Sequence, residues 1–324
     1  MKKVFILLLF FVSFGIPFRL LSAQMIINDS FCDRLSKQLL SCAVAVKTDP
    51  YEIPSIKKFP KQDPIAYTPV SKVHMLNESR LGPEFSYGVY MIENIRGGNN
   101  LPAYPCQDTA FVGSLVGKAF FGVFDGHGKF GERIAEEAAK NIPLNVLKHK
   151  GIEQGIKAAC KTTQERYRQA MYAQRSGTTL VCGVIQGKEL VVGNVGDSRL
   201  VVIRPSRNSI AFSTIDHKGV PGRLLALGRS LGDIEMHKLY GLSSEPELTR
   251  LVLEENDVLI FASDGYWDVV TNQQTYELVM QGIAEGIDSK ALAKKLAETA
   301  RIRKSKDDIT VLCVRYKKIS ELQK

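Results

Sequence analysis

Residues 119–128 read AFFGVFDGHG. The first six residues are apolar or glycine, and a short apolar run that ends in a turn signal is typical of a buried strand. The turn signal here is Asp125 followed by Gly126. The stretch therefore predicts an interior strand that holds the Asp125 carboxylate at the rim of a hydrophobic core.

Other apolar segments repeat this pattern along the chain. Two of them flank a Gln-Gly-Lys turn and predict a hairpin. Apolar residues spaced three and four apart predict helices between the strands. Grouped strands with paired helices between them favour antiparallel sheets flanked by helices, which is a layered α+β domain. The predicted strands after 119–124 are 180–185, 189–195, 200–203, 258–262 and 309–316, and the predicted helices are 131–141, 152–175, 272–282 and 289–303.

The overall composition is that of a globular protein. The chain has 324 residues, of which 44% are hydrophobic and 24% are charged, and this excludes a mostly disordered or fibrous chain. The formal net charge is +9, but the basic residues are spread out and follow no zinc-finger or RNA-binding pattern. We therefore expect no nucleic-acid partner, and we expect a monomer. Six cysteines are too few for a disulfide scaffold.

The first 23 residues have the pattern of a signal peptide or signal anchor. A basic start is followed by a mainly apolar run over residues 4–18 and by the small residues Ser22 and Ala23. The run is shorter than the roughly 20 residues that span a bilayer comfortably. We expect a protein of the secretory pathway, or one with a membrane tether if residues 1–23 stay attached. If Met25 is the true start, we expect a cytoplasmic protein.

Residues 24–82 predict a proline-rich extension. Their five spaced prolines disfavour both helices and central strands. Cys32 and Cys42 lie in this stretch and either pair with each other or remain free thiols. We expect the folded domain to span residues 83–318 and residues 319–324 to form a short tail.

Four aspartates stand next to the ends or starts of the predicted strands, and a fifth, Asp108, is expected to begin the first strand of the core. Each of them alone is consistent with an ordinary turn residue. If several of them converge, their charges repel one another unless cations lie between them. Carboxylate oxygens without nearby Cys or His ligand pairs favour Mg²⁺ or Mn²⁺ over Zn²⁺. The five residues are Asp108, Asp125, Asp197, Asp264 and Asp307.

Six short motifs follow one another along the chain. They are FDGHG (124–128), SGTT (176–179), NVGDSR (194–199), GRSLGD (228–233), ASDGYWDV (262–269) and DDITV (307–311). Together they resemble the metal-dependent serine/threonine protein phosphatases of type 2C, the PPM family. The resemblance covers about residues 85–317. It implies a central β-sandwich of two antiparallel sheets flanked by helices, with a two-metal centre at one end and phosphoproteins as substrates.

The resemblance also implies metal-binding roles for the aspartates. Asp125 is expected to bridge two Mg²⁺ or Mn²⁺ ions, with the Gly126 carbonyl on one of them. Asp264 and Asp307 are expected to bind the second ion, and Asp197 a weaker third ion. Two such ions offset the charge of a phosphate group and supply an activated water for hydrolysis of phosphoserine or phosphothreonine.

Three further residues complete the implied centre. His127 is expected to act as the general acid that protonates the leaving alkoxide, although a structural histidine is the other interpretation. Arg96 follows Tyr87 by nine residues, the family spacing of an arginine that grips the phosphate. Asp108 is also expected among the metal-site residues, because it matches the second acid of a family pair whose first position is Gln107 here.

The chain departs from the family pattern near the expected site. Gln107 replaces a carboxylate, and Asp308 stands where an asparagine is commoner. Only four residues separate Lys218 from Arg223, so most of the flap beside the active site is missing. We expect this shortened flap to change substrate access and selectivity.

Two alternative functions remain at this level. The departures are compatible with a pseudophosphatase that acts as a binding or scaffold protein, although the retained Asp125, Asp264 and Asp307 favour an enzyme. Cys160 and Arg166 have the spacing of a cysteine-dependent phosphatase. The residues between them contain no glycine and lie in a predicted helix, so we interpret this spacing as a coincidence.

Overall fold

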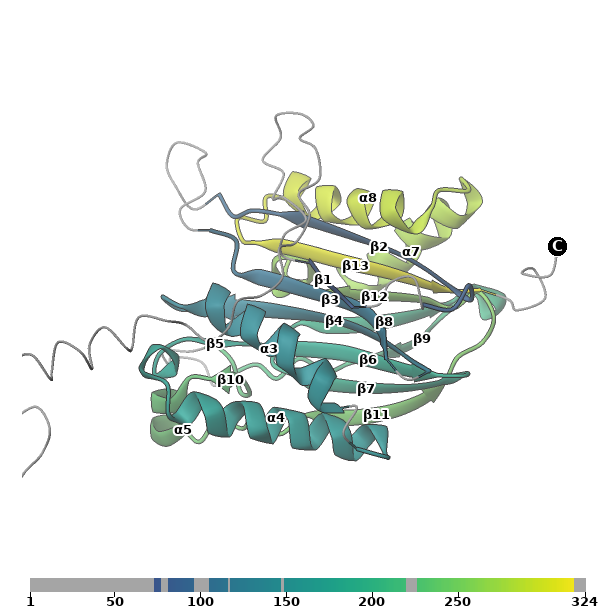
Figure 1. Ribbon diagram of the computed structural model, residues 1–324. Helices are drawn as coiled ribbons and strands as arrows, with labels where there is room; N and C mark the ends of the chain where they lie inside the picture. Colours follow the sequence, from purple (N-terminus) through teal and green to yellow (C-terminus); the bar gives the residue numbers. More distant parts are fainter. Residues whose placement is uncertain are drawn as a thin grey trace, which may run out of the picture. The chain divides into compact units, whose positions relative to one another are not determined.

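Two β-sheets pack face to face, and helices cover the outer face of each sheet (Figure 1). The computed structural model describes residues 73–76, 81–95, 105–115, 117–146, 149–219 and 226–317. This architecture confirms the predicted α+β sandwich.

The larger sheet has eight strands and carries the 119–128 stretch. Its main path runs β1-β3-β4-β6-β7-β11, and β5 pairs with both β4 and β10 beside that path. Among the described pairs only β1–β3 is parallel. The strands are β1 (Val73–Leu76), β3 (Asp108–Leu115), β4 (Lys118–His127), β5 (Gly177–Thr178), β6 (Leu180–Gln186), β7 (Glu189–Val195), β10 (Leu231–Gly232) and β11 (Glu247–Val252).

The smaller sheet is antiparallel throughout. Its order is β2 (Phe85–Ile92), β13 (Ile309–Tyr316), β12 (Val258–Ala262), β8 (Arg199–Arg204) and β9 (Ser209–Ser213). The strands predicted over 258–262 and 309–316 have these same bounds. Residues 196–198 carry the chain from β7 in one sheet to β8 in the other, and Asp197 lies in this crossing.

Alternate residues of the central strands face different layers of the core. In β4, Phe120 and Phe124 pack against helices, whereas Phe121 and Val123 pack between the two sheets. A strand of a sandwich shows this alternation because successive side chains point to opposite faces. Both faces of β4 are covered over residues 119–124, so this part of the strand is apolar.

Four longer helices form the outer layers. α3 (Gly131–Val146) and α4 (Ile152–Arg168) pack on the larger sheet, and α7 (Asn272–Ala284) and α8 (Ser289–Ile302) pack on the smaller one. Two short helices, α5 (Ile234–Tyr240) and α6 (Asp264–Trp267), and 3₁₀ turns at Met171–Ala173 and Pro205–Arg207 complete the described elements.

The helix predicted over 152–175 ends early, at Arg168. Ala170 is extended, and a separate 3₁₀ turn follows it. Tyr167 of the helix and Ala173 of the turn are buried in the same core cluster. The apolar pattern continues past the helix because two different elements bury side chains against one core.

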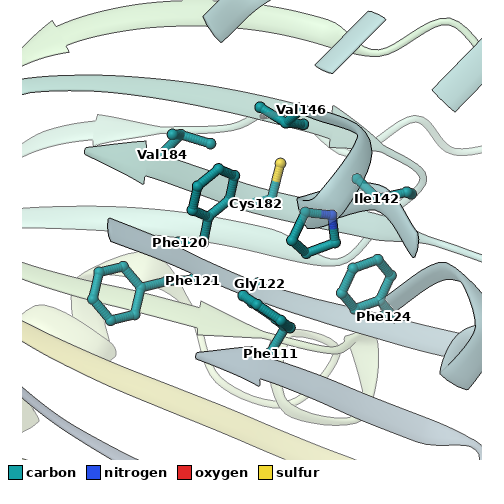
Figure 2. Close-up of a pocket in the computed structure, with 10 residues that line it drawn as sticks. Phe111, Phe120, Phe121, Gly122, Phe124, Ile142, Val146, Cys182 and Val184 are labelled. Atoms are coloured by element: carbon teal, nitrogen blue, oxygen red, sulfur yellow. The ribbon is translucent and has the colours of Figure 1, made fainter. Parts of the chain in front are cut away.

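A small cavity lies in the core between α3 and the larger sheet (Figure 2). Its volume is about 10 Å³, roughly the space of one water molecule. Its lining is apolar and includes Phe111, Phe120, Phe124 and Cys182. This cavity is a packing defect of the core and not a binding site.

Several predictions about the chain ends lie outside the described residues. They concern the segment 1–23, Cys32, Cys42 and the tail 319–324. Strand β1 falls inside the predicted extension 24–82 and adds a parallel strand to the edge of the larger sheet. No helix among the described residues is long and apolar enough to cross a bilayer.

Candidate functional site

A polar cavity of about 220 Å³ lies where segments of both sheets meet. β4 contributes Asp125, Gly126 and His127, while Asp264 follows β12 and Asp307 precedes β13. The lining also contains Asn94, Gln107, Gly128, Thr179, Asp197, Ala226, Leu227 and Asp308. Four of the five aspartates singled out in the sequence therefore face one cavity.

The fifth aspartate, Asp108, lies behind this cavity. It is directly opposite Asp125 in the β3–β4 pairing and is 1% exposed. The hydroxyl of Ser263 donates a 2.8 Å hydrogen bond to its Oδ2. Its Oδ1 is buried and makes no hydrogen bond of normal geometry within the described part of the chain. Asp108 is thus placed to act on Asp125 and not to face a ligand in the cavity.

Close backbone contacts explain the glycines that follow Asp125 and Asp264. A Cβ on Gly126 would overlap the carbonyl groups of Gln107 and Gly131. A Cβ on Gly265 would overlap the carbonyl of Asp308. Only glycine allows backbone segments to approach this closely, so both Asp-Gly pairs are needed to close the cavity wall.

The carboxylates of the site perturb one another. Removal from water raises the pKa of Asp125 well above its usual value, and the charges of Asp108 and Asp264 raise it further. Burial, followed by the charges of Asp197 and Asp268, raises the pKa of Asp264 to about 7. Burial and the charge of Asp308 raise the pKa of Asp108 to about 8. The cluster is therefore an unfavourable concentration of negative charge, which bound cations would relieve.

The donor set fits hard divalent cations. The candidate side-chain ligands are all carboxylates, whose oxygens Mg²⁺ and Mn²⁺ prefer. Among the described residues, no three acidic, histidine or cysteine side chains already converge on a single metal position. The carboxylates instead surround the cavity, an arrangement suited to ions that keep several water ligands.

His127 forms an ion pair that the sequence did not reveal. Its Nε2 lies 2.6 Å from Oδ2 of Asp233, whose side chain is 2% exposed. Burial lowers the pKa of His127, but the charge and the hydrogen bond of Asp233 outweigh that effect and raise it. Gly177 packs against this pair, and a Cβ there would overlap Asp233. Asp233 ends the GRSLGD motif, which was the sole sequence signal for it.

Gln107 stands where the family pattern has a carboxylate, and Asp308 provides a carboxylate next to it. Asp308 Oδ1 accepts hydrogen bonds from the backbone and side-chain nitrogens of Asn94 at 2.8 and 3.0 Å. Asp308 Oδ2 accepts one from the backbone of Gln107 at 3.0 Å. Gln107 itself donates from Nε2 to the carbonyl of Gly128 at 2.7 Å. The two departures from the family pattern therefore occur side by side, and the wall keeps a negative charge.

The short flap ends beside the cavity. Gly219 donates a backbone hydrogen bond to Ala226, and Ala226 and Leu227 line the cavity. Lys218 precedes this loop, and its Nζ lies 2.7 Å from Oδ2 of Asp197. Burial raises the pKa of Asp197, although the Lys218 ammonium acts in the opposite direction.

The sequence also singled out Arg96 and Cys160. Arg96 lies outside the described residues, so its role stays a prediction. Cys160 is fully buried in α4, where burial and neighbouring Cys182 raise the pKa of its thiol. A nucleophilic cysteine needs an accessible thiolate, so the structure supports the interpretation of the Cys160 spacing as a coincidence.

Comparison with known proteins agrees with the motifs and the geometry. A family model described as "Protein phosphatase 2C" matches residues 104–221 and 219–309. "Probable protein phosphatase 2C 59" of Oryza sativa subsp. japonica is 34% identical over 262 residues, which cover 72% of this chain and 76% of that protein. "Probable protein phosphatase 2C 58" of Arabidopsis thaliana is 35% identical over 226 residues, covering 60% and 76% respectively.

Solved structures share the fold at lower sequence identity. The serine-threonine phosphatase 2C of Toxoplasma gondii matches with a TM-score of 0.57 and 22% identity, over 71% of this chain and 95% of that one. The catalytic domain of the phosphatase PstP, in complex with 2 manganese ions, matches with a TM-score of 0.55 and 18% identity, over 72% and 99%. The chain belongs to the protein phosphatase 2C family of serine/threonine protein phosphatases.

Proposed function

We propose that the protein hydrolyses phosphoserine and phosphothreonine in phosphoproteins with the help of two Mg²⁺ or Mn²⁺ ions. The main support for this proposal is that four aspartates line one cavity: Asp125, Asp197, Asp264 and Asp307. Burial and mutual repulsion raise the pKa values of Asp125 and Asp264 there. The manganese complex of PstP is an independent reason to expect ions in this fold.

Asp125, Asp264 and Asp307 would hold the ions, together with the Gly126 carbonyl. Bound divalent ions neutralise the phosphate charge and lower the pKa of a water that attacks phosphorus. Asp108 repels Asp125 from behind, which favours binding of a cation in front of Asp125. Asp308 and Asn94 brace the loop beside Asp307 through their hydrogen bonds.

His127 would donate a proton to the leaving serine or threonine oxygen. Because Asp233 engages Nε2, the proton for the leaving oxygen comes from Nδ1. Asp233 then fixes the orientation of the ring and favours its protonated form. Arg96 is proposed to contact the phosphate, on the basis of its spacing from Tyr87 alone.

A phosphopeptide assay on the purified chain tests this function. We expect release of phosphate in Mn²⁺ or Mg²⁺, loss of activity in EDTA and recovery with excess Mn²⁺. Full activity in EDTA would exclude the metal mechanism. Metal binding without hydrolysis of any phosphopeptide would instead favour the pseudophosphatase alternative.

The segment 1–23 is proposed to direct the protein to the secretory pathway or to tether it to a membrane. The mass of the native N-terminus distinguishes cleavage from retention, and a native start at Met25 would place the protein in the cytoplasm.

A further inference from the structure

Lys218 is placed among three carboxylates at the edge of the cavity. Its Nζ lies 2.7 Å from Asp197 Oδ2, 3.6 Å from Asp268 Oδ1 and 3.9 Å from Asp216 Oδ2. Asp216 is already paired with Arg199 through two hydrogen bonds of 2.7 and 2.8 Å. The charge of Lys218 is therefore directed mainly to Asp197 and Asp268.

The backbone fixes Lys218 in this position. His217 donates to the carbonyl of Gly196, the residue before Asp197, at 2.9 Å. On the other side, Gly228 donates to the carbonyl of His217 at 2.7 Å, and Lys218 forms a β-bridge with Leu227. The short flap thus returns the chain so that Lys218 stays next to the Asp197 turn.

The exposed fractions of the Asp197 and Lys218 side chains show where the ammonium lies. The Asp197 side chain is 5% exposed, whereas that of Lys218 is 48% exposed. The ammonium therefore covers Asp197 from the solvent side, and the stem of Lys218 has room to swing away. Lys218 does not line the cavity, so it is not positioned to touch a substrate phosphate there.

We propose that the Lys218 ammonium is a built-in cation beside the Asp197 and Asp268 carboxylates and competes there with a third divalent ion. This inference rests on the proposed metal centre, of which Asp197 forms one edge. A divalent ion between Asp197 and Asp268 would lie a few ångströms from the ammonium, where two positive charges repel strongly in a partly buried setting. A third ion therefore binds there only when the Lys218 ammonium moves away from Asp197.

Manganese titration followed by calorimetry and electron paramagnetic resonance tests the competition on the full chain. We compare wild type with Lys218→Met, which removes the charge and keeps the side-chain length. We expect the weakest Mn²⁺ site to become at least about tenfold tighter in Lys218→Met, because a charge-assisted hydrogen bond no longer opposes the ion. Adding Asp268→Asn to Lys218→Met is expected to remove this gain.

Two variants serve as controls. Lys218→Arg keeps the positive charge and is expected to bind Mn²⁺ as wild type does. Lys157→Met removes a lysine whose Nζ lies 3.5 Å from Glu245 Oε1, at an exposed pair outside the cavity, and is also expected to leave Mn²⁺ binding unchanged.

Equal Mn²⁺ affinities at every site in wild type and a natively folded Lys218→Met would overturn the proposal. If Lys218→Met does not fold, a labelling experiment on the wild-type protein tests the proposal instead. Saturating Mn²⁺ is then expected to increase the rate at which acetic anhydride labels Lys218, measured by peptide mass spectrometry, and an unchanged rate overturns the competition. Absence of any Mn²⁺ binding in wild type is a different result, because it refutes the metal centre itself.

Discussion

The pair of His127 and Asp233 leads to a prediction about the pH dependence of catalysis. A general acid must carry its proton, so activity falls as the pH rises through the pKa of His127. Asp233 raises that pKa through its charge and a 2.6 Å hydrogen bond. Asp233→Asn keeps the shape of the side chain and removes its charge, so it lowers the pKa of His127.

The size of the effect follows from the geometry. A hydrogen bond to a charged group contributes about 1.5–3 kcal/mol, and about 1.36 kcal/mol corresponds to one pKa unit. We expect the alkaline limb of the pH–rate profile for a phosphoserine peptide to move about one to two units toward lower pH. Hydrolysis of p-nitrophenyl phosphate is expected to change much less, because nitrophenolate leaves without protonation.

Glu235→Gln is the matched control for this experiment. It makes the equivalent change two residues later in α5, at an exposed carboxylate that pairs with Arg175. We expect its pH–rate profile to match that of wild type. An unmoved alkaline limb in folded Asp233→Asn would refute the role of Asp233, and equal losses on both substrates would argue against proton donation by His127.

Three further predictions concern the rest of the site. Asp125→Asn is expected to lower the rate of phosphopeptide hydrolysis about 10²-fold or more, which is roughly 2.7 kcal/mol of transition-state stabilisation. Cys160→Ser is expected to keep the wild-type rate in the same assay. The reverse pattern would contradict the metal mechanism. Arg96→Ala is expected to raise KM for peptide and aryl phosphates to a similar extent, and unchanged kinetics on both would remove Arg96 from the site. Burial and repulsion raise the pKa of Asp264 to about 7 and that of Asp108 to about 8, so the folded protein binds more protons than the unfolded chain between about pH 4 and 8. The melting temperature of the metal-free protein is therefore expected to fall as the pH rises through this window and to recover with Mn²⁺, and a metal-free melting temperature that rises over the same window would contradict the raised values.

The sequence by itself determined several core strands and four of the aspartates that line the cavity. β12 and β13 were predicted with their observed bounds because both faces of each strand are buried, which leaves continuous apolar runs between turn signals. Asp125 and Asp264 were identified because each follows such a run and precedes a glycine. These signals are local, so a short stretch of chain contains all of them.

Only the tertiary structure decided how the strands are shared between the sheets. β7 and β8 are separated by three residues, yet they belong to different sheets. β1, in the predicted extension, pairs with β3 and not with its sequence neighbour β2. Strand pairing depends on contacts between distant segments, and no spacing of apolar residues encodes it.

For the same reason, the sequence revealed the aspartates that line the cavity but not the charged residues that pair with the site. Asp233 lies 106 residues from His127, and Lys218 lies 21 residues from Asp197. Neither pair has a characteristic spacing, because an ion pair requires only that two side chains meet in space. The sequence identified the aspartates as candidate carboxylate ligands. Only the folded structure showed which charged side chains lie next to each of them.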